Sequence, residues 1–269
     1  MPRCLKSGIF DVLQIKPKIF ATANQKGGVG KTTTTLNLAA AIAEAGFKVL
    51  VMDLDPQGNA STGLGSHADA REFTTYDVLI GTHVEPRFIQ KTDIENIDLV
   101  PSTTDLSSAD IELANAKNRS KKLRKAFGNS DLSKYDYVLL DCPPSLNVLT
   151  VNALIAAHAL IIPLQSEFFA LEGLSQLLMS VREVRDLGNP DLRIEGVVLT
   201  MYDARNRLSL QVEEDARENL GELVFKTVIP RNVRISEAPS FAMPVLSYDS
   251  RSKGAEAYRA LAQEILARR

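Results

Sequence analysis

Short apolar runs alternate with longer segments of helical periodicity along most of this chain. Most of the runs are continuous in Val, Ile and Leu, which is typical of strands that are buried on both faces. This alternation predicts an α/β fold: a mostly parallel twisted sheet with helices on both faces. The expected strands are Lys18–Ala23, Lys48–Asp53, Ile97–Val100, Tyr137–Asp141, Leu160–Leu164, Gly196–Met201 and Val224–Ile229. The expected helices are Thr32–Ala45, Asp105–Ala116, Ser120–Phe127, Leu146–Ala157, Leu171–Leu187, Leu208–Leu220 and Ala255–Ala267.

The chain shows no composition shift, repeat or linker that would mark a domain boundary. We therefore expect residues 18–269 to form a single domain, a size that suits one large α/β unit. Residues 1–17 have weak patterning and are interpreted as a partly mobile N-terminal extension. The Gly- and polar-rich stretch Gly58–Thr75 predicts a long loop near the carboxyl edge of the sheet.

Composition excludes several classes of protein. The chain holds 31 Lys and Arg against 33 Asp and Glu, a balance that a histone-like nucleic-acid binder does not have. Its two cysteines, Cys4 and Cys142, cannot form a disulfide scaffold or a four-cysteine metal site, and they suit a reducing compartment. No apolar run reaches the length of a signal core or a membrane span. We expect a cytoplasmic protein that does not bind membranes.

The strongest motif is a Gly-rich loop at residues 24–33, which follows an expected strand and opens an expected helix. Its glycines let backbone N–H groups point at phosphate oxygens, and the helix adds its positive N-terminal dipole. Lys31 supplies a charge to the outer phosphates, and the Thr32 hydroxyl is a Mg²⁺ ligand. The predicted nucleotide-binding residues here are Lys26, Gly27, Gly28, Val29, Gly30, Lys31, Thr32 and Thr33.

This loop departs from the plain template G-x-x-x-x-G-K-[ST], because Gln25 stands where the first Gly is expected and Lys26 adds a second lysine. The run K-G-G-V-G-K-T-T resembles the deviant Walker A motif of the ParA/MinD superfamily of ATPases. That resemblance implies a P-loop NTPase fold with ATP and Mg²⁺ as cofactors. It also implies that Lys26 reaches across an ATP-sandwich homodimer to the partner's nucleotide, so that Lys26 and Lys31 are both catalytic.

Two strand ends carry carboxylates. Period-two alternation places Asp53 and Asp55 on the same side of their segment, at the edge where open α/β sheets bind ligands. The segment resembles the family signature D-x-D-P-Q-G-N, which implies that Asp55 orients the attacking water and Asp53 helps to hold the Mg²⁺ shell. Asp141 ends an apolar strand as a Walker B residue does and is predicted to bind Mg²⁺. The alternative for Asp53 and Asp55 is a capping or solvated carboxylate.

Cys142 follows Asp141 directly. No histidine is placed to activate its thiol, so we interpret Cys142 as a small buried residue.

Three later segments, at residues 166–173, 199–205 and 229–240, are similar to the ParA/Soj branch of chromosome and plasmid partition proteins. The resemblance assigns Pro230, Asn232 and Met201 to the nucleotide base. It assigns Arg205 and Arg234 to sequence-independent binding of double-stranded DNA, for which several cations must share one face. A second run of six cations lies between Lys117 and Lys125 and fits either DNA or a partner, or a solvated helix face.

The resemblance implies a DNA-partition switch. Mg-ATP drives dimerisation and binding to the nucleoid DNA, and a ParB-type centromere-binding protein stimulates slow hydrolysis and release. The main alternative is a MinD-like, membrane-associated regulator of cell division, which needs an amphipathic C-terminal anchor. The tail Gly254–Arg269 fits better as a helix packed on the sheet. The cysteine spacing argues against an iron–sulfur carrier, whereas a metabolic P-loop enzyme remains an open alternative.

Overall fold

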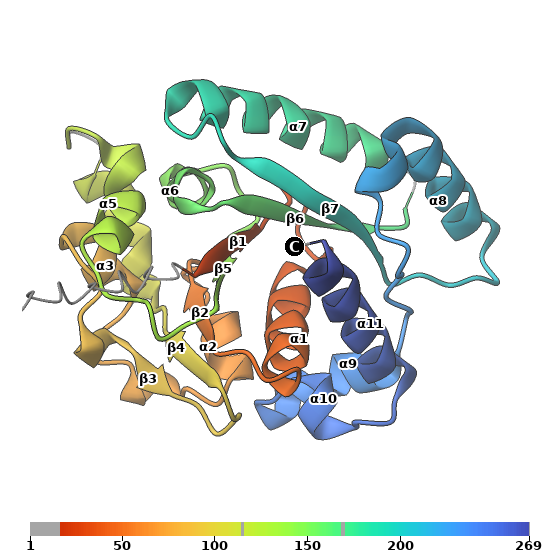
Figure 1. Ribbon diagram of the computed structural model, residues 1–269, viewed down its shortest axis with the longest axis horizontal. Helices are drawn as coiled ribbons and strands as arrows, with labels where there is room; N and C mark the ends of the chain where they lie inside the picture. Colours follow the sequence, from red (N-terminus) through yellow and green to blue (C-terminus); the bar gives the residue numbers. More distant parts are fainter. Residues whose placement is uncertain (1–16, 114–115, 168–169, 269) are drawn as a thin grey trace, which may run out of the picture.

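The computed structural model describes residues 17–113, 116–167 and 170–268, and within them one sheet runs through the molecule (Figure 1). Its strand order is β3-β4-β2-β5-β1-β6-β7. All neighbours are parallel except β3, which pairs antiparallel with β4 at one edge. The strands are β1 (Lys18–Thr22), β2 (Val49–Asp53), β3 (Gln90–Lys91), β4 (Ile97–Val100), β5 (Tyr137–Asp141), β6 (Ala159–Gln165) and β7 (Arg193–Thr200).

Helices cover both faces of the sheet, as the sequence predicts (Figure 1). Apolar residues of α3, α5, α6, α7 and α8 pack on one face, and those of α1, α10 and α11 pack on the other. The helices are α1 (Lys31–Glu44), α2 (Asn59–Gly63), α3 (Thr75–Ile80), α4 (Ala109–Glu112), α5 (Lys122–Gly128), α6 (Val148–Ala156), α7 (Ala170–Leu187), α8 (Arg207–Leu220), α9 (Val233–Glu237), α10 (Val245–Tyr248) and α11 (Lys253–Ala267).

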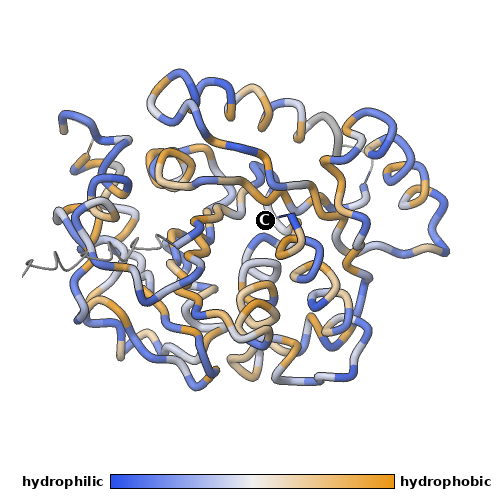
Figure 2. The backbone as a smooth tube through the Cα atoms, in the orientation of Figure 1, coloured by the Kyte–Doolittle hydropathy of each residue, from blue (hydrophilic) through white to orange (hydrophobic). Residues whose placement is uncertain are grey.

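Strand β5 shows why the apolar runs are continuous. Val138 and Leu140 enter the core under α6 and α7, whereas Tyr137 and Leu139 enter the core under α1 and α11. Successive side chains of a strand point to opposite faces, so a strand with two covered faces needs apolar residues at every position. Each fully buried side chain of this kind stabilises the fold by roughly 1.5–3 kcal/mol. Figure 2 shows the result as hydrophobic strands inside polar outer loops.

The expected strands other than Val224–Ile229 match β1, β2, β4, β5, β6 and β7 to within a few residues. The expected helices that match single helices are those at α1, α6, α7, α8 and α11. The helix expected over Ser120–Phe127 is divided into η4 (Arg119–Lys121) and α5. Side-chain caps fix the start of three of these helices: Asn147, Asn206 and Ser252 each accept a hydrogen bond from backbone N–H in the first turn of α6, α8 and α11.

The prediction of a strand over Val224–Ile229 is wrong. This segment contacts β7 at its two ends without a continuous ladder: Phe225 N–H donates to the Val197 carbonyl at 2.9 Å beside an isolated Val224–Val197 bridge, and Ile229 N–H donates to the Leu199 carbonyl at 2.8 Å. The next two N–H groups are taken by a side chain: Lys226 and Thr227 donate to the Glu264 carboxylate at 2.9 and 3.1 Å. With its donors satisfied by α11, the segment does not form a ladder with β7.

The loop expected over Gly58–Thr75 is also wrong in part, because it contains α2 and the 3₁₀ turn η1 (Ala68–Ala70). Gly58 adopts φ +65° before α2, a left-handed conformation that favours glycine. The helix expected over Asp105–Ala116 is divided into η3 (Thr104–Ser108) and the short α4. Of the expected extension, only Pro17 lies within the described residues.

Candidate nucleotide-binding site

The Gly-rich loop connects β1, an interior strand between β5 and β6, to α1. Gly28 and Gly30 adopt φ +74° and +85°, which turn the chain sharply enough to direct successive N–H groups inward. Gly30 precedes α1, and no side chain caps this helix. The N–H groups of the first turn of a 14-residue helix thus face the loop without a side-chain acceptor. This is the geometry of an anion site at a helix N-terminus.

Neighbouring strands hold the loop in place. The Thr200 hydroxyl at the end of β7 donates to the Val29 carbonyl at 2.9 Å. The Asn24 side chain donates to the Pro163 carbonyl in β6 at 2.8 Å and accepts from Lys26 N–H at 3.0 Å. The loop is therefore fixed at several points before any ligand binds, and a fixed loop loses little entropy when it binds one.

The two lysines of the loop lie in different environments. Lys31 is buried, and its ammonium donates to the Lys26 carbonyl at 2.9 Å. Burial lowers the pKa of Lys31, while the nearby charge of Asp141 raises it. The Lys26 ammonium instead lies at the surface, 2.7 Å from the Glu167 carboxylate, with its side chain 39% exposed. Lys31 thus faces into the loop, and Lys26 faces out from its rim.

Asp141 lies directly under the loop. Its carboxylate accepts from the Thr32 hydroxyl at 2.7 Å and from the Thr35 hydroxyl at 3.0 Å. Burial raises the pKa of Asp141, and the charge of Asp53 on the neighbouring strand raises it further. A cation bound beside Thr32 and Asp141 would relieve this repulsion. Hydroxyl and carboxylate oxygens are the donors that Mg²⁺ prefers, so the pair fits that ion.

The described residues include no cluster of three or more His, Cys, Asp or Glu side chains suited to hold a metal alone. Mg²⁺ in phosphate-binding sites commonly keeps several waters and takes only one or two protein ligands beside the phosphates. The combination of Thr32 and Asp141 matches that mode of binding.

Asp53 is fully buried at the end of β2 and has structural partners. Its carboxylate accepts from Ser61 N–H at 2.8 Å, from the Ser61 hydroxyl at 2.7 Å and from Asp55 N–H at 3.0 Å. Burial raises the pKa of Asp53, and the hydrogen bonds from Ser61 oppose that shift. The Asp53 carboxylate therefore joins α2 to the end of β2. The sequence motifs did not predict this contact with Ser61.

Asp55 follows β2 and is only 9% exposed. Its carboxylate accepts from Gln57 N–H at 3.0 Å, and its charge acts on Lys31 and Asp141. The structure therefore places Asp55 close to Lys31 and Asp141 at the Gly-rich loop.

Cys142, next to Asp141, is buried, and burial raises the pKa of its thiol. Its interpretation as a small buried residue is confirmed.

The residues predicted to contact the base lie together after β7. Met201 follows the strand with φ +52°, and Tyr202 forms an isolated parallel bridge with Pro230. Asn232 uses its side-chain oxygen to cap α9, accepting from Arg234 N–H at 2.9 Å. None of Met201, Pro230 and Asn232 lines the cavity of about 450 Å³ beside the start of α1.

That cavity lies between α1, α2 and η6 (Ala238–Phe241), and Thr32 and Thr33 form part of its wall. Its other lining residues include Asn37 and Asn59, which sequence reasoning did not single out. Asn59 belongs to the D-x-D-P-Q-G-N segment, so its motif carried a signal that pointed to the site. Asn37 belongs to no motif, and only its position near the start of α1 could have pointed to the site.

The two arginines assigned to DNA are both ion-paired. Arg205 contacts Asp203 at 3.0 Å, with its side chain 90% exposed. Arg234 is half-exposed and contacts Glu237 at 2.9 Å and Asp249 at 3.2 Å. A phosphate that bound either arginine would have to compete with these carboxylates. The basic run between Lys117 and Lys125 begins just before η4 and continues through η4 into α5, which lies at the other end of the molecule from α8 (Figure 1). Most of its basic side chains are exposed.

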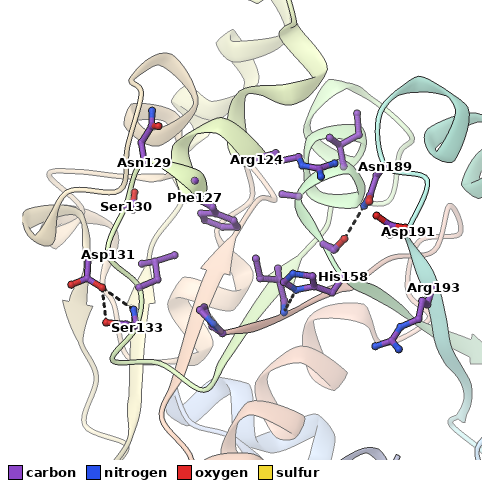
Figure 3. Close-up of a pocket in the computed structure, with 17 residues that line it drawn as sticks. Arg124, Phe127, Asn129, Ser130, Asp131, Ser133, His158, Asn189, Asp191 and Arg193 are labelled. Carbon is purple, nitrogen blue, oxygen red and sulfur yellow. Dashed lines mark hydrogen bonds between the residues drawn. The ribbon is translucent and has the colours of Figure 1, made fainter. Parts of the chain in front are cut away.

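A cavity of about 970 Å³ lies at the amino edge of the sheet, away from the Gly-rich loop (Figure 3). Arg124, Phe127, His158, Asn189 and Arg193 line it, together with the start of β1. None of the predicted site residues belongs to its wall.

Comparison with known proteins identifies the family. A family model described as AAA domain (AAA_31) matches residues 17–194. The chromosome partitioning protein ParA of Caulobacter vibrioides is 54% identical over 252 residues, which cover 93% of this chain and 94% of the relative. The chain belongs to the ParA/Soj family of partitioning ATPases. The sporulation initiation inhibitor protein Soj of Bacillus subtilis is 50% identical over 250 residues, 93% of this chain and 98% of the relative.

The fold of this ParA/Soj family member also matches solved structures. Cobyrinic acid a,c-diamide synthase from Mycobacterium smegmatis, solved with bound ATP analog and magnesium, superposes with a TM-score of 0.80 at 39% identity. The match covers 93% of this chain and 94% of that chain. The predictions of a P-loop ATPase fold and of ATP and Mg²⁺ as cofactors are confirmed at the level of the family.

Proposed function

We propose that this ParA/Soj family member is a partition switch that couples Mg-ATP to DNA binding and segregates a chromosome or plasmid. The observation that carries the proposal is that the two lysines of the loop point in different directions. Lys31 is buried and faces in, whereas Lys26 faces out from the rim. A loop that serves one nucleotide needs only the inward lysine, and the outward one is placed to serve a second subunit.

The chain's own residues account for nucleotide binding. The N–H groups of the loop and the first turn of α1 bind phosphate oxygens, and Lys31 adds a full charge. Thr32 and Asp141 would hold Mg²⁺, with Asp53 beside Asp141 in the sheet register. The metal, when bound, neutralises charge on the phosphates. Met201, Pro230 and Asn232 contact the base in this proposal.

Hydrolysis requires two further groups. Asp55 orients the attacking water, and Lys26 of the partner subunit offsets the charge that develops on the transferred phosphoryl group. For this, Lys26 must leave Glu167. Exposed ion pairs of that kind contribute only about 0.5 kcal/mol, so dimerisation can replace the pair at little cost. The catalytic set is complete only in the dimer, which makes hydrolysis by a single subunit slow.

The ATP-bound homodimer binds double-stranded DNA without reading its sequence. Arg205 and Arg234 contact phosphates, and dimerisation doubles the number of cations. A ParB-type centromere-binding protein stimulates hydrolysis and so releases the dimer from the nucleoid in the cytoplasm. In this proposal ATP links the two subunits, so its hydrolysis removes the link and ends DNA binding.

The MinD-like alternative is less well supported. In the described part of the chain, no helix has both the length and the apolar character to cross a bilayer. The apolar residues Tyr258, Leu261 and Ile265 of α11 are buried in the core against α1 and the sheet. A helix whose apolar face is already buried cannot insert that face into a membrane surface.

The experiment is a DNA-shift titration of the full chain with ADP, ATP and a slowly hydrolysed ATP analogue at two salt concentrations. We expect shifts only with ATP or the analogue, and a mass in solution that doubles under the same conditions. Lys31→Ala is the control, and it should show neither effect. DNA binding that is equal with ADP and ATP, or a mass that never doubles, contradicts the switch. Steady turnover that needs neither DNA nor a protein partner would instead favour a metabolic enzyme.

A further inference from the structure

Arg71 is a buried arginine that joins three segments beside the candidate site. Its guanidinium donates to the Ser66 carbonyl at 2.6 Å, to the Ser102 carbonyl at 2.9 Å and to the Thr62 hydroxyl at 2.8 Å. Its side chain is buried, and burial lowers the pKa of Arg71 while the charge of Asp53 opposes that shift. All of its hydrogen bonds to described residues go to neutral oxygens.

Gly58 packs directly against this guanidinium. A Cβ atom at Gly58 would lie 2.3 Å from Arg71 Nη1 and 2.9 Å from the Ser102 carbonyl oxygen. Gly58 also has φ +65°, a conformation that disfavours residues with a Cβ. The close approach shows that the turn before α2 and the guanidinium fit against each other with no space to spare.

The same turn positions Asp55. Gly58 N–H donates to the Asp55 carbonyl at 2.9 Å, and Gln57 N–H donates to the Asp55 carboxylate at 3.0 Å. Thr62, which accepts from Arg71, donates its own hydroxyl hydrogen to the Gly58 carbonyl at 3.1 Å. Arg71 therefore supports the turn in two ways, by direct packing on Gly58 and through Thr62.

We propose that Arg71 is a positioning residue for ATP hydrolysis, which holds the turn of residues 55–58 so that the Asp55 carboxylate faces the attacking water. The inference rests on the proposed role of Asp55. Burying a charge with neutral partners is costly, and an apolar side chain would fill the space more cheaply. An apolar side chain cannot, however, serve carbonyl and hydroxyl acceptors of three segments at once, as the planar guanidinium does.

Loss of the Arg71 side chain should displace the Asp55 carboxylate but leave the phosphate-binding loop intact. The Gly-rich loop is held separately by Thr200 and Asn24. A misplacement of about 1 Å in a catalytic group costs up to roughly 100-fold in rate. We expect the rate of hydrolysis to fall while ATP affinity stays close to that of the parent chain.

The test measures phosphate release at saturating Mg-ATP, and ATP affinity by fluorescent-nucleotide titration, for Arg71→Ala and Arg71→Lys of the full chain. Arg71→Ala should lower kcat by roughly tenfold and change the Kd for ATP by less than about threefold. Added methylguanidinium should restore kcat of Arg71→Ala, because it fits the space that the side chain leaves. The matched control is Arg259→Ala, which removes an arginine bonded to Glu44 and Ser250, remote from the site.

Three outcomes overturn the inference: kcat of Arg71→Ala equal to that of Arg259→Ala, no recovery with methylguanidinium, or equal losses in kcat and ATP affinity. If Arg71→Ala does not fold, as judged by circular dichroism, Arg71→Lys decides alone, since it keeps the stem and charge but lacks the planar fork. Lowered kcat with parental ATP affinity then supports the inference, and parental kcat refutes it.

Asp55→Ala is assayed beside the two Arg71 variants. If Asp55→Ala hydrolyses ATP at the parental rate, the proposed function of Asp55 fails. If it is inactive and Arg71→Ala is fully active, only the positioning role fails.

Discussion

The two edges of the sheet are built from similar residue types but in opposite ways. At the carboxyl edge, Lys31, Asp53, Asp55 and Asp141 bring one buried cation and three carboxylates together. At the amino edge, the polar groups around the larger cavity are tied to backbone: His158 Nδ1 accepts from Ile19 N–H at 2.9 Å. The carboxyl edge thus gathers four ionisable side chains that are each at most 9% exposed, whereas at the amino edge the His158 ring serves a backbone group.

Cavity size is therefore a poor guide to chemistry in this molecule. The cavity of about 970 Å³ is more than twice the volume of the one of about 450 Å³ beside the loop. The amide of Asn189 at the larger cavity donates to the Leu154 and Ala157 carbonyls, both at 2.8 Å, and so joins the end of α6 to the turn between α7 and β7. Buried ionisable groups with shifted pKa values, such as Lys31 and Asp141 at the carboxyl edge, are by contrast typical of functional sites.

The largest expected effect comes from Lys31→Ala. The change removes the buried ammonium from a site with three carboxylates and should weaken ATP binding by at least about 100-fold, as measured with a fluorescent nucleotide. Lys48→Ala is the matched control, because Lys48 is an exposed lysine just before β2 at the amino edge. Equal ATP affinity of the two variants would contradict the placement of the nucleotide site at the carboxyl edge.

Asp55→Ala comes next. We expect this variant to bind ATP and form the dimer but to hydrolyse ATP roughly 100-fold more slowly, because no group orients the water. Phosphate release and the mass in solution measure the two properties. The control is Asp131→Ala at the amino edge, where the Asp131 carboxylate accepts from Ser133. A parental hydrolysis rate for Asp55→Ala contradicts its assignment.

Charge reversal at Arg205 or Arg234 should have a smaller effect. Each change should weaken DNA binding about tenfold for every sequence and lower the slope of log K against log salt by about one. Arg193→Glu, at the amino edge, is the comparison. If Arg193→Glu weakens binding more than the other two, the DNA surface lies at the amino edge, near the basic run of α5, and our assignment is wrong.

The smallest effect is expected for His158→Ala. Loss of the hydrogen bond to Ile19 N–H should reduce the free energy of unfolding by about 1 kcal/mol, measured by urea denaturation. ATP affinity should not change, since β1 carries the loop at its other end. A marked loss of ATP binding in this variant would show that the amino edge contributes to the site.

Sequence patterns predicted the parts of the fold that depend on local composition. The strands with two covered faces, such as β5, need continuous apolar residues, and the Gly-rich loop has a fixed spacing. The pattern failed at Val224–Ile229, where the Glu264 carboxylate takes the N–H groups that a ladder would use. Periodicity carries no information about a competing side chain on a distant helix.

The same limit applies to the site. The motifs pointed to Lys31, Thr32, Asp55 and Asp141, which the structure gathers around one loop. They did not point to Ser61 or Arg71, whose hydrogen bonds join segments that no motif connects. Such partners become visible only when the chain is folded, because many residue types at those positions would satisfy the sequence pattern equally well.

The place of β1 inside the sheet bears on when the Gly-rich loop reaches its final geometry during synthesis. The loop that follows β1 depends on Pro163, 139 residues after Asn24, and on Thr200, 171 residues after Val29. A nascent chain that has emerged only as far as α7 lacks the second of these anchors. We therefore expect the Gly-rich loop to reach its finished geometry only after residue 200 has left the ribosome, although the loop itself is complete by residue 33.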